Sequence, residues 1–153
     1  MLKHIKGNIF DSDADIIIHQ VNCQGVMDGS ITKEVQKRYP AVYKKYKAWC
    51  DAPQFSDSLL GKIQSVNSGN LKKQIIVNMF SQNKYGNDKC YTDYDALKKC
   101  LEAVNRAYKG HTVAVPYLFA CYKGGGNGDI VSKLLEETLT DCDVTLYEHI
   151  EEV

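Results

Sequence analysis

The chain contains 153 residues, 44% of them hydrophobic, and its 19 basic and 19 acidic side chains give a formal net charge of zero. That length fits one domain, residues 1–153, with a hydrophobic core of its own. The neutral balance gives no strong electrostatic signal for nucleic acid or an anionic membrane, and no apolar run approaches the roughly 20 residues of a membrane helix. We expect a monomeric cytoplasmic protein that does not contact membranes.

Apolar patterns predict alternating strands and helices along the chain. In chain order these are an edge strand at Leu2–Lys6, a buried strand at Asp15–Val21, a helix capped by Ser30, a helix starting at Pro40, strands at Leu60–Val66 and Gln74–Phe80, a helix opened by a capping box of Thr92 and Asp95, a strand at Thr112–Tyr117, a helix capped by Asp129 and a strand at Val144–His149. Strands that alternate with helices predict an α/β fold, with a mainly parallel sheet covered by helices on both faces.

Within the predicted helices, apolar residues recur at helical spacing and mark the faces that turn towards the sheet. They are Ile31 and Val35 in the first helix, Val42, Tyr46 and Trp49 in the second, Leu97, Cys100, Leu101, Val104 and Tyr108 in the third, and Ile130, Val131, Leu134 and Leu135 in the fourth. In folds of this class, ligands bind beyond the carboxyl ends of the strands. The loops that follow the strands are therefore the expected place of a site.

Two of these loops contain glycines and each precedes a predicted helix. The first covers residues 21–30, Val-Asn-Cys-Gln-Gly-Val-Met-Asp-Gly-Ser, and the second covers residues 122–129, Tyr-Lys-Gly-Gly-Gly-Asn-Gly-Asp. Glycine lets the main chain approach a ligand closely, and the N–H groups and dipole of the following helix attract anions. Two such loops facing one another would clamp a diphosphate, so a nucleotide is the leading ligand.

Six cysteines are scattered along the chain, at positions 23, 50, 90, 100, 121 and 142. A zinc site needs clustered ligands and a disulfide-rich secreted domain is shorter, so we expect reduced thiols, no metal and no cofactor. Cys23 and Cys121 lie in or beside the glycine loops. For both, packing behind the loop is favoured over nucleophilic catalysis, because no neighbouring cation is evident that would lower the thiol pKa.

Several motifs occur in an order that points to one family. They are Lys6-Gly7-Asn8-Ile9, the block His19-Gln20-Val21-Asn22-Cys23-Gln24-Gly25-Val26-Met27, Tyr85-Gly86, Tyr91-Thr92 and Gly124-Gly125-Gly126. With them the chain resembles macro domains, the α/β modules that bind ADP-ribose. It is most similar to the small bacterial and phage macro proteins grouped with the ADP-ribose-1''-phosphate phosphatase and the terminal ADP-ribose glycohydrolase. The resemblance implies a three-layer α/β/α fold with a mixed, mainly parallel central sheet.

The resemblance also implies where ADP-ribose would lie. Asn8 and Ile9 would lie beside the adenine, where the Asn8 side-chain carbonyl can accept a hydrogen bond from the adenine amino group. Asn22 and Gln24 would face the distal ribose, and Tyr85 would either close over it or pack against the protein. The other implied ligand contacts are Gly25, Val26, Met27, Gly29, Ser30 and Ile31 in the first loop and Cys121, Tyr122, Lys123, Gly124, Gly125, Gly126 and Asn127 in the second.

The chain departs from the family pattern in both loops. Asp28-Gly29-Ser30 stands where Gly-Ser-Gly or Gly-Ala-Gly is usual, and it introduces a carboxylate beside the expected diphosphate. Ala120-Cys121-Tyr122 replaces the usual Gly-Cys-Gly, and Asn127-Gly128 replaces an acidic residue followed by tryptophan. Lys123 places a cation near the same anion.

The candidate catalytic residues are His19, Asn22 and Asp28. By resemblance to the phosphatase, His19 would exchange protons with a substituent of the distal ribose; a core histidine bonded to the backbone is the alternative. Asn22 would orient the substrate. Asp28 would either activate a water or be a solvated turn residue. A covalent lysine mechanism is disfavoured, because Met79-Phe80-Ser81-Gln82 supplies no lysine at the end of its strand.

Three functions remain open from the sequence. The first is an enzyme that binds an ADP-ribose derivative, free or attached to a macromolecule, and hydrolyses a bond at the distal ribose. The second is a reader that binds the same ligand without turnover. The third is a divergent macro scaffold that has lost nucleotide binding.

Overall fold

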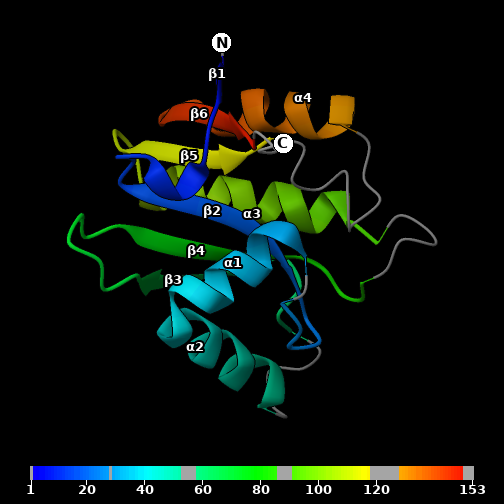
Figure 1. Ribbon diagram of the computed structural model, residues 1–153. Helices are drawn as coiled ribbons and strands as arrows, with labels where there is room; N and C mark the ends of the chain where they lie inside the picture. Colours follow the sequence, from blue (N-terminus) through cyan, green and yellow to red (C-terminus); the bar gives the residue numbers. More distant parts are fainter. Residues whose placement is uncertain (1, 28, 53–57, 86–90, 118–127, 150–153) are drawn as a thin grey trace.

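The computed structural model describes residues 2–27, 29–52, 58–85, 91–117 and 128–149 (Figure 1). Its elements, in chain order, are β1 (Lys3–Lys6), the 3-10 helix η1 (Ile9–Asp11), β2 (Ile16–Asn22), α1 (Ser30–Arg38), α2 (Pro40–Asp51), β3 (Ile63–Asn67), β4 (Ile75–Gln82), α3 (Tyr94–Ala107), β5 (Thr112–Pro116), α4 (Gly128–Thr138) and β6 (Asp143–Glu148). The strands form one six-stranded sheet in the order β1-β6-β5-β2-β4-β3.

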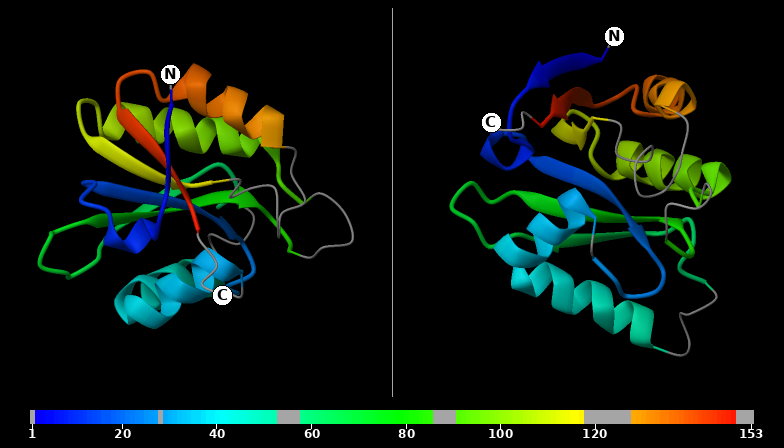
Figure 2. Two further views of the ribbon diagram at one scale, coloured as in Figure 1. Left: turned by 45° about the horizontal axis from the view of Figure 1, so that its top comes forward. Right: turned by 45° about the vertical axis from the view of Figure 1, so that its right-hand side comes forward.

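The sheet is mainly parallel: β3 pairs antiparallel with β4, and the other strand pairs are parallel. Helices α1 and α2 cover one face of the sheet and α3 and α4 cover the other (Figure 2). The predicted three-layer α/β/α architecture is therefore confirmed. Within the described ranges, every helix is too short or too polar to cross a membrane.

Strand β2 lies between β4 and β5, and all seven of its residues are buried. Because successive side chains alternate, Ile16 and Ile18 enter the core beneath α3 and α4, whereas Ile17 enters the core beneath α1 and α2. Each buried isoleucine contributes about 2 kcal/mol to stability. The carboxyl-terminal half of the same strand buries polar side chains, His19 and Asn22 among them, which therefore need partners inside the protein.

The second predicted helix is confirmed. Helix α2 begins at Pro40, whose ring fixes φ and whose missing N–H would be unpaired in a first turn anyway. Val42 and Tyr46 are fully buried, as their spacing predicts. The strand predicted at Leu60–Val66 starts later, at Ile63.

The predicted caps of two helices are wrong by one residue. Helix α1 has Gly29 as its N-cap and Ser30 as its first residue. The hydroxyl of Thr32 accepts the Gly29 N–H at 3.0 Å, which satisfies this donor without a capping side chain at residue 29. Helix α4 begins at Gly128, so Asp129 lies in the first turn, where its carboxylate favours the positive end of the helix dipole.

One predicted inward position of α4 is also wrong. Ile130 is 44% exposed, whereas Val131 and Leu135 are buried against the sheet. The inward stripe of this helix is therefore narrower than the run of apolar residues suggests, because side chains four apart share a face and immediate neighbours do not.

The predicted capping box of α3 is wrong as well. Asp93 is the N-cap, and its carboxylate accepts the Ala96 N–H at 3.0 Å. Thr92 instead pairs with Gln82 in an isolated bridge between strands. Asp95 lies in the first turn of the helix.

We predict that Asp93→Ala lowers the free energy of unfolding by about 1 kcal/mol, the typical value of a lost N-cap. In a domain of this size that corresponds to a fall in Tm of about 3 °C. Asp95→Ala removes a carboxylate from the same turn and serves as the matched control, with a loss of about 0.3 kcal/mol. Thermal unfolding followed by circular dichroism measures both. Equal losses in the two variants would contradict the assignment of Asp93 as the cap.

Candidate functional site

A cleft of about 400 Å³ opens beyond the carboxyl ends of β1 and β6, beside the start of α1. Its lining residues are Gly7, Asn8, Ile9, Phe10, Ser30, Ile31, Glu34, Arg38, Tyr147 and His149. The structure thus brings together four of the residues predicted from the sequence to bind ligand: Asn8, Ile9, Ser30 and Ile31. They come from two segments that are 20 residues apart and converge because β1 and β2 are parallel strands of one sheet.

One wall of the cleft is η1 and its cap. The side-chain carbonyl of Asn8 accepts the Phe10 N–H at 2.9 Å, which makes Asn8 the N-cap of this turn. A carbonyl oxygen has a second lone pair, so Asn8 can accept a further hydrogen bond from a ligand. The Arg38 guanidinium lies over the Phe10 ring, 4.9 Å from its centroid, and its Nε donates to Glu34 at 3.0 Å.

Six lining residues were not predicted from the sequence as ligand contacts: Gly7, Phe10, Glu34, Arg38, Tyr147 and His149. The sequence held a signal for two of them, because Glu34 and Arg38 are four apart on a predicted helix, a spacing that predicts an ion pair on one face. Tyr147 lies on the last strand and His149 directly follows it, so both could be placed beside Asn8 only once the strand order was known.

The first glycine loop is organised by Asn22. Its Oδ1 accepts the main-chain N–H of Gln24 at 2.9 Å, and its Nδ2 donates to the carbonyl of Val26 at 2.7 Å. From α2, the hydroxyl of Tyr46 lies 2.8 Å from both the main-chain oxygen and Oδ1 of Asn22. With 4% of its surface exposed, Asn22 faces the loop itself. Gly25 has φ +82°, a conformation that requires glycine and lets the loop turn.

Tyr46, which packs against this loop, and Cys23 within it are uncharged. Burial and the neighbouring Cys50 raise the pKa of Tyr46, so its hydroxyl stays a protonated donor. Burial raises the pKa of Cys23 to about 12, with Cys50 adding to the shift. Cys23 is 7% exposed, which supports the expectation that it packs behind the loop as a thiol.

His19 is the first member of a buried hydrogen-bond chain that leads to α2. The carbonyl of Lys45 can only accept, so the Gln64 amide donates to it at 3.0 Å and turns its oxygen towards Asn78. The Asn78 amide donates to that oxygen at 3.0 Å and presents its own oxygen to His19 Nε2. His19 therefore carries its proton on Nε2, and Nδ1 has no partner within the described part of the chain.

Burial lowers the pKa of His19 to about 4, although the hydrogen bond to Asn78 acts in the opposite direction. The ring is neutral at pH 7 and cannot act there as a proton donor through an imidazolium. His19 is a buried ring bonded to the Asn78 side chain instead of the backbone, and its role in catalysis stays a prediction. Among the residues that the structure describes, no donor reaches its Nδ1.

The remaining predicted residues lie as follows. Gln24 is exposed and donates to Asn83, both to its main-chain oxygen at 3.0 Å and to its side-chain oxygen at 3.2 Å. Met27 is buried, and Tyr85 is 43% exposed and so is not packed into the core. Asp28 and residues 121–127 lie outside the described residues, so the approach of the two glycine loops stays a prediction. Among the residues described, no three His, Cys, Asp or Glu side chains gather as a metal site.

No protein-family model matches the sequence. A solved structure, the macrodomain of Mycobacterium tuberculosis DarG, superposes on 96% of this chain and 97% of its own with a TM-score of 0.76 at 24% identity. This chain has the macrodomain fold. The six-stranded mixed sheet between two layers of helices is therefore that of a macrodomain.

Two curated proteins resemble the sequence of this macrodomain. The DNA ADP-ribosyl glycohydrolase of Mycobacterium tuberculosis is 28% identical over 155 aligned positions, which cover 96% of this chain and 42% of that protein. The ADP-ribose 1''-phosphate phosphatase of Aspergillus oryzae is 38% identical over 60 residues, which cover 39% of this chain and 30% of that protein. The chain therefore spans less than half the length of these relatives.

Proposed function

We propose that this macrodomain binds ADP-ribose in the cleft and hydrolyses a bond at the distal ribose. The observation that carries the proposal is the convergence of Asn8 and Ile9 with the first residues of α1 on one cleft. In this pose the adenine lies against η1, and the diphosphate runs past the amino end of α1. The two curated relatives, an ADP-ribose 1''-phosphate phosphatase and a DNA ADP-ribosyl glycohydrolase, support the same substrate class.

The first turn of α1 suits a diphosphate. Its leading N–H groups have no acceptor within the helix, and the helix dipole adds an attraction of about 0.3–1 kcal/mol for an anion at this end. Helix α1 has no acidic residue in its first turn. Gly25, held in its left-handed conformation by the Asn22 network, lets the main chain of the loop come close to the phosphates and the distal ribose.

Within this proposal, His19 acts through Nδ1. Nε2–H is committed to Asn78, so Nδ1 is the nitrogen left to accept a proton; because this atom is buried and does not line the cleft, the step requires water or the ribose hydroxyl to reach it. Asn22 keeps the loop in place for the substrate. The bond that water cleaves is the one between the distal ribose and its phosphate or macromolecular substituent.

A substrate attached to a polynucleotide is favoured by one further observation. Helices α1 and α2 carry six basic and two acidic residues, which leaves 13 basic and 17 acidic residues in the rest of the chain. The exposed side chains of Lys33, Lys37, Lys44 and Lys45 form no ion pair with any described residue. A basic face beside the cleft attracts phosphates, even though the net charge of the whole chain is zero.

Calorimetric titration with ADP-ribose tests binding, and incubation with ADP-ribose-1''-phosphate and with an ADP-ribosylated oligonucleotide tests turnover. We expect binding and the hydrolysis of at least one substrate. Asn8→Ala will weaken binding about tenfold, whereas Asn105→Ala will not. Asn105 accepts the Asp141 N–H at 2.9 Å, as Asn8 accepts that of Phe10, but it lies on α3, on the opposite face of the sheet from α1. Binding without turnover would favour a reader that binds ADP-ribose without hydrolysing it. An absence of binding would overturn the proposal.

A further inference from the structure

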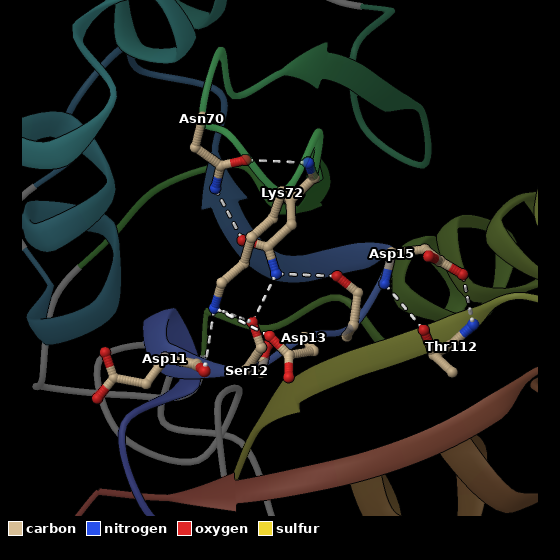
Figure 3. Close-up of polar contacts among 9 residues, drawn as sticks. Asp11, Ser12, Asp13, Asp15, Asn70, Lys72 and Thr112 are labelled. Carbon is tan, nitrogen blue, oxygen red and sulfur yellow. Dashed lines mark hydrogen bonds and ion pairs between the residues drawn. The ribbon is translucent and has the colours of Figure 1, made fainter.

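The segment from Asp11 to Asp15 joins the cleft wall to the central strand β2, and side chains from the β3–β4 turn hold its main chain (Figure 3). Nζ of Lys72 donates to the carbonyl of Asp11 at 3.2 Å and to the carbonyl of Ser12 at 3.0 Å. The same ammonium lies 3.2 Å from the carboxylate of Asp13. Three oxygen acceptors from consecutive residues therefore surround one cation.

Gln74 holds the same segment from inside the protein. Its side chain is 1% exposed, and Nε2 donates to the carbonyls of Ser12 at 2.9 Å and Ala14 at 2.8 Å. Asn70 fixes the orientation of this amide, because its Nδ2 donates to Gln74 Oε1 at 2.8 Å and its Oδ1 accepts the Gln74 N–H at 3.1 Å. The β3–β4 turn thus presents Lys72 and Gln74 as two ordered donors.

These donors act on the peptide units that close η1. The peptide group between Asp11 and Ser12 is planar, so Lys72 at its carbonyl also sets the direction of its N–H. That N–H donates to the carbonyl of Ile9 at 3.2 Å, and the Asp11 N–H donates to the carbonyl of Asn8 at 3.0 Å. A 3-10 turn of three residues is too short to hold itself by its own hydrogen bonds.

The far end of the segment is fixed independently. The Asp15 N–H donates to the hydroxyl of Thr112 at 2.8 Å, and its carboxylate accepts from the Thr112 N–H at 3.2 Å (Figure 3). The same carboxylate lies 3.1 Å from Nδ1 of His111. Ile9 and Phe10 fix the side chains of η1 by their burial in the core. Between η1 and the anchored β2, Lys72 and Gln74 hold the main chain from Asp11 to Ala14.

We propose that Lys72 and Gln74 are positioning residues for the base-binding wall of the cleft, a role that rests on the proposed function. Neither residue lines the cleft; both act through the peptide units of residues 11–14. The β3–β4 turn therefore sets the affinity for the adenosine half of the ligand without touching it.

The test compares Lys72→Met, which keeps the aliphatic stem, with Lys72→Arg, which keeps the cation, and with Lys73→Met as the matched control. The exposed Lys73 side chain makes no hydrogen bond or ion pair with any described residue. Hydrogen exchange of the Asp11 and Ser12 amides in the free protein reports the order of the wall. Calorimetry measures the affinity for AMP and for ADP-ribose, and a thermal melt records overall stability.

We expect Lys72→Met to speed exchange of both amides about tenfold. The variant will weaken the binding of AMP and of ADP-ribose equally, by about three- to tenfold. Lys72→Arg will restore most of both values, and Lys73→Met will change neither. Unchanged exchange in Lys72→Met overturns the inference, as does faster exchange with unaltered affinity. If the unmodified chain binds neither ligand, the proposed function fails, and the exchange rates then decide separately whether Lys72 orders the wall.

Discussion

Replacing Asn22 with alanine will lower the free energy of unfolding by about 3 kcal/mol and weaken ADP-ribose binding more than tenfold. The side chain satisfies the Gln24 N–H, the Val26 carbonyl and the hydroxyl of the fully buried Tyr46. Alanine leaves the Gln24 N–H and the Val26 carbonyl without this partner, and each unsatisfied buried group costs about 1–3 kcal/mol. The Tyr46 hydroxyl keeps its bond to the main-chain oxygen of residue 22. The loss is larger than for a surface asparagine because water cannot readily replace the missing amide.

The effect on binding follows from the effect on the loop. Gly25 keeps its left-handed conformation because Asn22 ties the residues before and after it, so the variant loses the arrangement proposed to face the phosphates. Thermal unfolding and calorimetry measure the two consequences; in a chain of this length about 3 kcal/mol corresponds to a fall in Tm of roughly 9 °C. Asn105→Ala, on α3, which loses the bond that Asn105 accepts from the Asp141 N–H, is the control. An Asn22→Ala protein that melts and binds like the unmodified chain would refute the assignment.

Lowering the pH from 7.5 to 5.0 will cost the folded protein about 2 kcal/mol through His19 alone. Its pKa of about 4 in the folded state lies below the ordinary value of 6.5, so the unfolded chain binds the proton more readily. Stability from this group is fully present above pH 6.5 and is lost as the pH falls towards 4. Hydrogen bonds from the Thr112 backbone and from His111 lower the pKa of Asp15, which therefore titrates below this window.

Urea unfolding gives the free energy of unfolding at pH 7.5 and at pH 5.0, and comparison with a variant that lacks His19 isolates the contribution of this residue. His19→Gln is the informative variant, because its amide can still donate to Asn78 but does not titrate. We expect the variant to lose about 2 kcal/mol less than the unmodified chain between pH 7.5 and 5.0. An identical pH dependence in the two proteins would show that His19 does not carry a depressed pKa in the fold.

The helix starts show how far local patterns reach. Thr92 and Asp95 have the spacing of a capping box, yet Asp93 caps α3, because Thr92 pairs with Gln82 across the sheet. Propensity at one position is a matter of a few tenths of a kcal/mol to about 1 kcal/mol, and a strand pairing outweighs it. The stripe on α3 that includes Leu97 and Val104 was correct, because burial of many side chains enforces it.

The amino-acid sequence alone determined the order of strands and helices, the buried β2 and the need for glycine at residue 25. These features depend on neighbouring residues, through periodicity and backbone sterics, and so are readable locally. Tertiary packing alone decided the protonation of His19 and the bonding of the Asn22 side chain to its own loop. It also decided the placement of Tyr147 and Arg38 in the cleft and the role of Lys72. Each of these depends on which distant segments pack together, since burial and hydrogen-bond partners are supplied by other elements of the fold.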